Sequence, residues 1–566
     1  MAPGRSLRIP AIGTSAVVAA AVFYVAYEDG SYSVASRSAI AIAVWWTILA
    51  GVVARVWPVE RIPKGAVVTG SLLAAFAVWD LASTAWAASA EKAYTEFDRT
   101  ALYLGVYVLV VVSTDRRRRA NVVDGLTAAI AAIGVAALLS RLFPGLFPNR
   151  GLSTSLPNAS TRLSFPLDYW NGLGIFVALA FPLLLYWMLG GDRARRVAAL
   201  ALVPALGAVV YLTSSRGAVV ALAGGVVVFF VAQPRLWRFF GAARASRRLR
   251  VAAIVLAALL VAVGVYGTMR TIQHFTRLPT GDAGGEHLLS GGGSGRWQFW
   301  TAALHEFEDS PLHGRGAGSY GAWWLQHGSF RYFVQNAHSL YLETLGELGI
   351  LGFLLVVGAL AAGVVVAVRR LLGSSGGERT LIAALLGTFT VYLIGAGVDW
   401  MWELTAVTLV GVFVLGLLTG PATATPGAAA FAPGRLAAAV AAVVAGTVVL
   451  AEAVSLLTDV EVRRSQADAR AGNLRLARSH AADATKIEPW AATPYVQLAL
   501  VDESAGDLAA ARRAIGAAIR RDDADWRTWW IAARIERRLG ETAATKSSLE
   551  HAKALDPRSS RFSPHT

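Results

Sequence analysis

Long apolar stretches separated by short polar connectors dominate the chain from its start to about residue 456. A helix needs about 20 mostly apolar residues to cross the hydrocarbon core of a bilayer. The stretches predict roughly thirteen membrane-spanning helices, centred near residues 18, 47, 75, 106, 131, 179, 204, 225, 260, 357, 388, 411 and 444. The first has the basic start and apolar core of a signal peptide, but no clear small-residue cleavage site follows, so we expect a retained helix. The pattern predicts an all-α, polytopic helical membrane protein with about 12–13 transmembrane helices.

Charged residues are scarce and unevenly placed along the chain. They make up 16% of the sequence, whereas a soluble protein carries about a quarter. The formal net charge of +15 does not predict a nucleic-acid partner, because the arginines fall between apolar stretches rather than on one face. The absence of cysteine excludes disulfides and thiolate metal sites.

The basic residues cluster in alternate connectors, which indicates how the chain crosses the membrane. Lys and Arg in short loops stay on the cytoplasmic side. One orientation therefore places the N-terminus inside and Asp399, residues 141–168, residues 270–337 and the C-terminal region outside. We expect a multi-pass protein of the cytoplasmic (inner) membrane, in contact with the lipid bilayer. The basic connectors are "ARVWPVERIPK", "TDRRRRA", "GGDRARR", "QPRLWRFFGAARASRRLR" and "VRRLLGSSGGER".

The last hundred or so residues are polar and rich in Ala, Arg and Glu, and they repeat. Gly472, Gly506 and Gly540 are spaced by 34 residues, and Pro489, Asp523 and Pro557 keep the same step. A 34-residue period of helix, turn and helix resembles the tetratricopeptide repeat (TPR) family. Such stacks bind partner segments, so we expect a possible protein partner here, although the Trp-rich positions are better explained as inter-helix core.

Two arginines stand at the predicted outer face, where an ionisable residue next to lipid is a functional candidate. Arg216 lies in the tight turn of "YLTSSRGAVVALAGG", and Arg296 opens an amphipathic helix in the long outer loop, "GRWQFWTAALHEFEDSPLHGRGAGSY". A snorkelling side chain is the alternative for Arg216, and a solvated one for Arg296.

The segment "NAHSLYLETLGELGILGF" (336–353) joins the outer loop to a strongly apolar stretch. His338 begins a predicted helix, and Glu343 and Glu347 share one face near its start. Carboxylates there also suit the helix dipole, so a capping role is an alternative. The histidines of the loop have irregular spacings without an H-E-x-x-H pair, so we expect a metal-independent site without cofactors.

These segments together resemble the Wzy/O-antigen ligase superfamily of bacterial membrane glycosyltransferases. The similar pieces are "RLSFPLDYWNGLGIFVALAFPLLL", "SSRGAVVAL", "GRGAGSY" and "NAHSLYLETLGELGILG", which together cover about residues 160–420. We therefore divide the chain into N-terminal transmembrane helices (1–160), a ligase-like core with the outer loop 270–337 (161–421), a last transmembrane helix (422–456) and TPR-like extracytoplasmic repeats (457–560).

The resemblance implies a GT-C-like glycosyltransferase at the outer face of the membrane. Its donor would be a glycan on undecaprenyl pyrophosphate, and its acceptor a hydroxyl of a glycan, lipid or protein, with inversion at the anomeric carbon. Arg216, Arg296 and His338 correspond to the family's functional residues, and Arg162 is a weaker candidate for pyrophosphate binding. Supporting roles would fall to Asn336, Glu343 and Glu347. A ligase, a polymerase and a protein O-oligosaccharyltransferase remain open, with a transporter less favoured.

Overall fold

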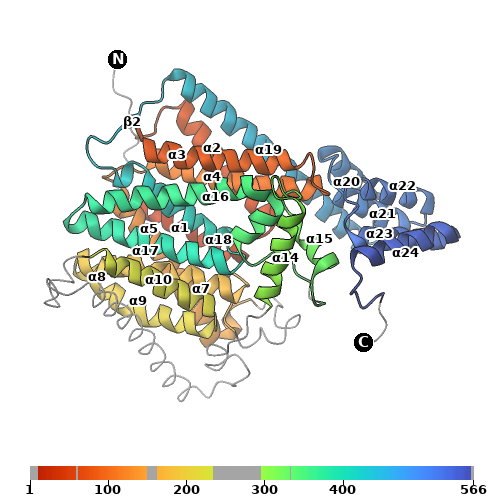
Figure 1. Cartoon of the computed structure of the whole chain (residues 1–566), viewed down its shortest axis with the longest axis horizontal. Helices are drawn as coiled ribbons and strands as arrows, with labels where there is room; N and C mark the ends of the chain where they lie inside the picture. The colour runs from red at the N-terminus through yellow and green to blue at the C-terminus, as the bar shows by residue number, and fades with distance from the viewer. Residues whose placement is uncertain (1–10, 59–60, 149–161, 234–294, 332, 563–566) are drawn as a thin grey trace.

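The fold is almost entirely helical in the residues that the structure describes (Figure 1). It is a computed structural model of the whole chain, and it describes residues 11–58, 61–148, 162–233, 295–331 and 333–562. The strands in these residues are β1 (Ile62–Pro63) and β2 (Ala430–Phe431), which pair antiparallel. The predicted all-α class is confirmed.

The helices form a large bundle and a smaller group near the C-terminus. The first part of the bundle contains α1 (Ala11–Tyr27), η1 (Asp29–Ser31), α2 (Val34–Val53), α3 (Lys64–Ser83), α4 (Ala90–Ser113), α5 (Arg119–Leu142), η2 (Pro144–Leu146), α7 (Trp170–Ala178), α8 (Ala180–Gly190), α9 (Arg193–Leu212) and α10 (Arg216–Val231). Two helices of the long loop follow, α14 (Arg296–Asp309) and α15 (Tyr320–His327). The bundle is completed by α16 (Leu340–Leu372), α17 (Gly376–Val398), α18 (Thr405–Thr419), η5 (Pro421–Thr423) and α19 (Arg435–Arg470).

The lengths and composition of these helices confirm a polytopic membrane protein. Eight helical segments of the described chain are long and apolar enough to cross a membrane: α2, α3, α5, α7 with α8, α9, α16, α17 and α19. The helices α1, α10 and α18 are apolar but shorter. The predicted span centre near residue 260 lies outside the described residues, and each other centre falls in one of these segments or in α4.

The burial pattern distinguishes a core from a lipid-facing surface. The side chains of α7 and α18 are almost all buried, and they form the middle of the bundle. Outer helices expose large apolar side chains, including Leu200, Val220, Leu354 and Val440. A water-facing surface would carry polar residues at such positions, so these side chains are placed to contact lipid.

Small polar residues begin several helices and set where the chain turns. The side chains of Ser33, Asp192 and Ser215 accept hydrogen bonds from backbone N–H groups in the first turns of α2, α9 and α10. These bonds satisfy donors that an uncapped helix leaves without partners. The cap at Ser215 matters for function, because it fixes the first turn of α10, where Arg216 stands.

A kink in α16 brings the outer loop against the bundle. Gly349 has a φ of +65°, and a β-carbon there would lie 2.5 Å from the backbone of Leu312. The N–H of Ile350 instead donates to the carbonyl oxygen of Pro311 at 2.9 Å. Only glycine combines this backbone conformation with so close an approach, so Gly349 docks the segment after α14 onto the helix that follows His338.

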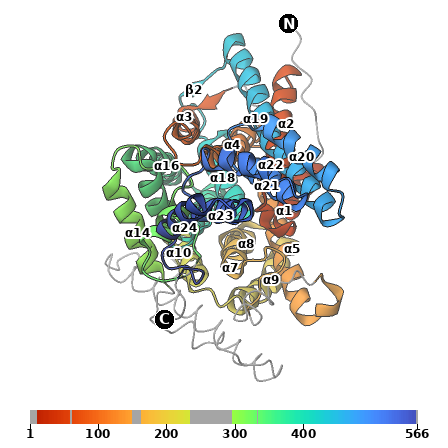
Figure 2. The same cartoon turned by 90° about the vertical axis from the view of Figure 1, so that its right-hand side faces the viewer.

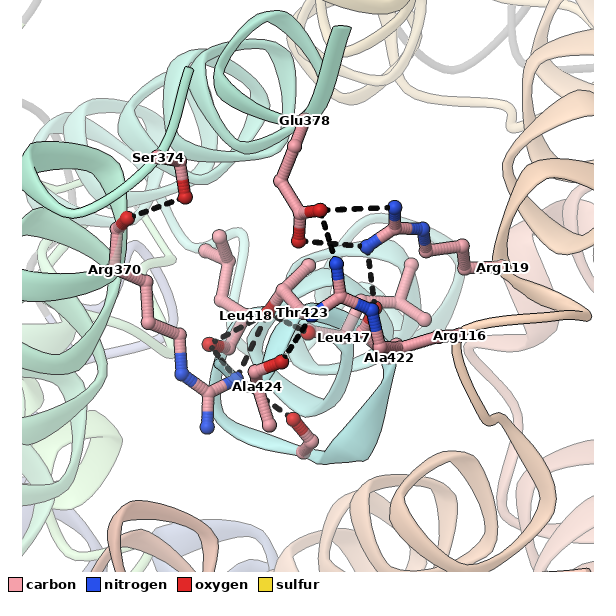
Figure 3. A network of polar contacts seen from close by, with 11 residues as sticks. Arg116, Arg119, Arg370, Ser374, Glu378, Leu417, Leu418, Ala422, Thr423 and Ala424 are labelled. Carbon is pink, nitrogen blue, oxygen red and sulfur yellow. Dashed lines mark hydrogen bonds and ion pairs between the residues drawn. The ribbon is translucent and has the colours of Figure 1, made fainter. Parts of the chain in front are cut away.

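The two ends of the bundle differ in chemistry. At one end lie the basic connectors, where Glu378 bonds Arg116 and Arg119, and Arg370 bonds the last carbonyls of α18 (Figure 3). At the other end lie the turns after α1, α3, α9 and α17 together with the loop that contains α14 and α15. The predicted site residues are at this second end.

The C-terminal helices form a group of short antiparallel hairpins at the second end of the bundle (Figures 1 and 2). They are α20 (Leu474–Ile487), α21 (Thr493–Ser504), α22 (Leu508–Ile519), α23 (Trp526–Leu539) and α24 (Thr542–Leu555). The repeating glycines 472, 506 and 540 all have left-handed conformations, with φ of 80°, 83° and 79°. The 34-residue period therefore marks equivalent turns, although membership of the TPR family stays a prediction.

The repeats are tied to the bundle in two ways. The helix α19 runs without a break from Arg435 to Arg470, so the boundary expected at residue 456 lies inside one helix. Contacts between side chains and backbone add to this link. A Glu91 oxygen accepts from the N–H groups of Ala492 and Thr493 at 2.7 and 2.9 Å, and Lys92 pairs with Asp522 at 3.0 Å.

We predict that Arg370→Met lowers the melting temperature of the purified protein in detergent. The guanidinium of Arg370 donates to the carbonyls of Leu418, Thr419 and Gly420 at 2.6–2.9 Å and to Thr423 at 2.8 Å. Hydrogen bonds to a charged group contribute about 1.5–3 kcal/mol each, and the substitution leaves carbonyls unpaired. Arg369→Met is the matched control, since the neighbouring Arg369 side chain is exposed. Equal melting temperatures for the two variants would contradict this role.

Candidate active site

Four of the residues predicted from the sequence line one pocket of about 230 Å³. The segment before α7 contributes Arg162, α10 begins with Arg216, α14 begins with Arg296, and His338 precedes α16. The remaining lining residues are Tyr169, Trp170, Asn171, Ser214, Gly217 and Trp400. Residues far apart in the sequence thus converge on one small, strongly cationic space.

The carboxylate of Asp399, directly after α17, organises the base of this pocket. Arg296 donates to Asp399 Oδ2 at 2.7 Å, and its Nε donates to the carbonyl of Val398 at 2.8 Å. Asp399 also accepts from the Tyr169 hydroxyl at 2.9 Å and from the Asn171 amide at 2.7 Å. Its side chain is 3% exposed. A buried carboxylate with this many donors holds its neighbours in one arrangement.

Arg162 braces the turn that carries Arg216. Its guanidinium donates to the carbonyls of Thr213 and Ser214 at 2.9 and 2.8 Å and lies 4.7 Å from the centre of the Trp170 ring. Burial lowers the pKa of Arg162 to about 10, and the nearby positive charges of Arg296 and Arg216 act in the same direction. Arg162 still keeps its charge at neutral pH.

Arg216 is the first residue of α10, as predicted from the short turn. Ser214 before it has a φ of +50°, and Thr213, Ser214 and Ser215 are all buried. The turn therefore directs the start of α10 at the pocket. A helix N-terminus adds partial positive charge and oriented N–H groups to the guanidinium, a combination that favours an anion.

His338 lies in the loop just before α16 rather than in the helix itself. The helix begins at Leu340, and His338 has a φ of +55°, an uncommon value for a residue with a side chain. The ring packs against Phe299 of α14 with centroids 5.0 Å apart. The sequence placed His338 at the start of the helix, and the difference arises because its backbone turns before the helix can begin.

The contacts of His338 define which ring nitrogen can take up a proton. Nδ1 lies 3.0 Å from the carbonyl oxygen of Asn336, and because a carbonyl only accepts, the neutral ring carries its hydrogen on Nδ1. The lone pair is then on Nε2, which lies 4.0 Å from Oδ1 of Asp399. The side chain is 23% exposed. His338 is therefore arranged as a proton acceptor beside a carboxylate.

The three residues expected to support the site take different positions. Glu343 accepts from the N–H of Ala337 at 2.7 Å, and the Asn336 amide donates to Glu403, so both hold the loop that carries His338. Glu347 instead accepts from the N–H groups of Gly318 and Tyr320, both at 2.9 Å. Glu347 fixes the glycine-rich turn before α15 and does not line the pocket.

Sequence reasoning missed Asp399, Tyr169, Asn171 and Trp400 as site residues. Asp399 and Trp400 stand at the end of a membrane span, where an ionisable residue is a functional signal. Tyr169 and Asn171 lie in the "DYWNG" of a segment that already carried the family resemblance. These signals were present, but nothing local to them showed that the two segments meet.

Among the described residues, no group of three His, Asp or Glu side chains is arranged to hold a metal ion. The expectation of a metal-independent site stays a prediction, and the positive charge that the structure does show in this pocket belongs to the arginines.

Comparison with known proteins points the same way. No curated protein matches the chain. Residues 199–357, which run from α9 to the middle of α16, match the family model described as O-Antigen ligase. The matched segment contains Arg216, Arg296 and His338, whereas Arg162 and Asp399 lie outside it. Over this segment the chain is similar to the O-antigen ligase family, which supports a glycan-transfer function for this helical membrane protein.

Proposed function

We propose that this chain is a membrane glycosyltransferase that transfers a glycan from undecaprenyl pyrophosphate to a hydroxyl acceptor. One observation carries the proposal: Arg162, Arg216, Arg296 and His338 line a single pocket at one end of a membrane bundle. The three guanidinium groups are suited to binding a polyanion, and the imidazole is suited to taking up the proton of the acceptor hydroxyl. The match to the O-antigen ligase family model supports a glycan as the group that is transferred.

The cationic side of the pocket fits a pyrophosphate. Guanidinium groups keep their charge and present paired N–H donors that match phosphate oxygens. The described residues that line the pocket include three arginines and no acidic side chain, and the nearby carboxylate of Asp399 is held by Arg296 and two neutral donors. The pocket therefore retains a net positive charge for a ligand.

The proposed reaction is a direct displacement. The acceptor oxygen forms a bond to the anomeric carbon, and the bond from that carbon to the phosphate oxygen breaks. The bonding electron pair leaves with the pyrophosphate, where the arginines stabilise the growing negative charge. The acceptor proton passes to Nε2 of His338. Attack opposite the leaving group inverts the anomeric carbon.

Asp399 links the two halves of this reaction. It holds Arg296 at 2.7 Å and lies 4.0 Å from Nε2 of His338. The negative charge of a carboxylate at that distance stabilises the imidazolium that forms when the proton arrives. The acceptor decides between ligase, polymerase and protein O-oligosaccharyltransferase, and the pocket fits all three.

We also propose that the end bearing the pocket faces the outside. The basic connectors gather at the opposite end, where Arg116, Arg119 and Arg370 lie (Figure 3). Connectors rich in Lys and Arg remain cytoplasmic. The repeats contact the pocket end, so they lie outside with it.

The orientation predicts the behaviour of a topology reporter. Alkaline phosphatase, which is active outside the cytoplasm, should be active when fused after residue 560 and inactive when inserted into the 373–375 turn. Green fluorescent protein at the same points should give the reverse pattern. A fluorescent fusion after residue 560 would place the repeats inside and invert the proposal.

We predict that Arg216→Lys is nearly as damaging as Arg216→Ala in a glycan-transfer assay. A lysine ammonium is a point charge and cannot form the two-pronged contact of a guanidinium with phosphate oxygens. Both variants should show transfer at least about tenfold below wild type, at equal membrane abundance. Arg193→Lys, on the exposed start of α9 at the basic end, is the matched control. Near-normal transfer by Arg216→Lys would argue against a bidentate contact.

We predict that His338→Ala reduces turnover by about a hundred- to ten-thousand-fold, the usual contribution of a general base. Donor binding and melting temperature should change little, because the ring is partly exposed and its loop is held by Glu343.

His305→Ala provides the comparison for that variant, since His305 is exposed on α14 and lines none of the cavities described. The assay measures transfer per folded molecule from a purified carrier-linked donor. Substantial transfer by His338→Ala would remove His338 from the mechanism and leave the arginines to act alone.

A further inference from the structure

The segment after α24, residues 556–562, reaches from the repeats to the outer loop beside α15 (Figure 1). Nη2 of Arg558 donates to the carbonyl of Trp324 at 3.1 Å and to that of Leu325 at 2.7 Å. Both carbonyls belong to the end of α15, where a helix leaves acceptors without partners inside it. A cation is also favourable at this negative end of the helix dipole. Arg558 is therefore a C-terminal cap that a distant part of the chain supplies.

Aromatic contacts hold this segment on the repeats. The Phe562 ring packs against Trp526 and Trp530 of α23, with centroids 5.9 and 5.5 Å apart. From the same helix, the guanidinium of Arg527 lies 4.9 Å from the centre of the Phe333 ring, in the loop after α15. The hydrophobic cluster inside the repeats lies on α21, α22 and α23 and does not include the segment. Loss of the contact between the segment and α15 should therefore leave the repeats folded.

A row of aromatic rings connects the capped end of α15 to His338. Trp324 is 1% exposed, and its ring meets Phe299 of α14 edge to face, with centroids 5.0 Å apart. Phe299 in turn packs against the imidazole of His338, with centroids also 5.0 Å apart. Phe330 contacts both Trp324 and Phe299, at 5.1 and 5.8 Å. Closely packed rings have few alternative arrangements, so the position of Trp324 limits that of His338.

The two ends of α15 are held by different parts of the molecule. Glu347 of α16 accepts from the N–H groups of Gly318 and Tyr320, where the helix starts. Arg558 bonds the other end and belongs to the repeats. Without Arg558, this end loses two hydrogen bonds, and Trp324 can then shift relative to α14.

We propose that Arg558 is a positioning residue, which keeps the His338 ring in place through Trp324 and Phe299. The proposal rests on the proposed function for the reaction that His338 serves. Arg558 lies outside the residues matched to the O-antigen ligase family model. In this way the repeats contribute to the candidate active site, because the segment after α24 limits where the proposed proton acceptor stands.

The first test measures how readily diethyl pyrocarbonate modifies His338 in the purified full chain. The reagent acylates a neutral imidazole, and peptide mass spectrometry reads each histidine separately. In Arg558→Met, modification of His338 should rise about fivefold, the increase in local opening expected when one hydrogen bond is lost. His480 of α20 is the reference histidine, because its side chain is 28% exposed and that of His338 is 23% exposed.

Arg561→Met is the matched control, because Arg561 is exposed on the same segment and lies over Trp530 of the repeats. It should leave His338 as protected as in the wild type. Arg558→Lys should restore most of the protection, since an ammonium can also donate to the last carbonyls of a helix. Equal modification of His338 in Arg558→Met and Arg561→Met would overturn the proposal. A parallel rise at His480 would do the same, because it would indicate general loosening.

Glycan transfer gives the second readout. Turnover by Arg558→Met should fall roughly tenfold, within the roughly hundredfold loss that a misplacement of about 1 Å can cause. Half-saturation by the carrier-linked donor should change little, because Arg296 keeps its own bonds to Asp399 and Val398. In a Phe299→Leu background, Arg558→Met should change neither labelling nor turnover further. Additive effects of the two substitutions would contradict an action through Phe299.

The two readouts distinguish failure of this proposal from failure of the proposed function, since the labelling needs no glycan transfer. If Arg558→Met exposes His338 but His338→Ala still transfers glycan, Arg558 positions the ring and the proposed role of His338 in the reaction fails. If His338→Ala abolishes transfer while Arg558→Met changes neither labelling nor turnover, the proposed function stands and the positioning role of Arg558 fails.

Discussion

The candidate site depends on one buried carboxylate. Asp399 bonds Arg296 from the outer loop and Tyr169 and Asn171 from the start of α7, and it lies 4.0 Å from His338. A buried charge is costly unless it is paired and hydrogen-bonded. Each partner therefore has an energetic reason to stay where it is, and together they hold three separate chain segments around one pocket. The turn before Arg216 is linked to the same assembly, because Arg162, which donates to its carbonyls, also donates to Asn171.

The repeats and the outer loop extend this arrangement away from the membrane. Gly349 docks the loop onto α16, Glu347 fixes its glycine-rich turn, and Glu91 accepts from the first turn of α21. Asn336 lines a cavity between the bundle and the repeats, and His338, two residues later, lines the arginine pocket, so the loop that carries both lies between these two spaces.

The helices and three main site residues were predictable because both signals are local. A membrane span needs only its own apolar length, Arg216 and His338 stand where an apolar stretch meets a loop, and Arg296 opens an amphipathic helix of the outer loop. Asp399 was not predictable as the organising residue, since its importance comes from four partners that no spacing connects. Glu343 and Glu347 show the same limit. Their spacing predicted that both lie on one face of the helix. Because the outer loop packs against that helix, Glu347 accepts a hydrogen bond from Gly318, whereas Glu343 accepts one from Ala337.

The unbroken helix α19 has a mechanical consequence. Its 36 residues make a rod about 54 Å long, of which about 30 Å crosses the hydrocarbon core, so about 24 Å projects beyond it. The repeats are mounted on this rod and cannot rise or tilt independently of the bundle. The length of this rod therefore limits how far the repeats can stand from the hydrocarbon core.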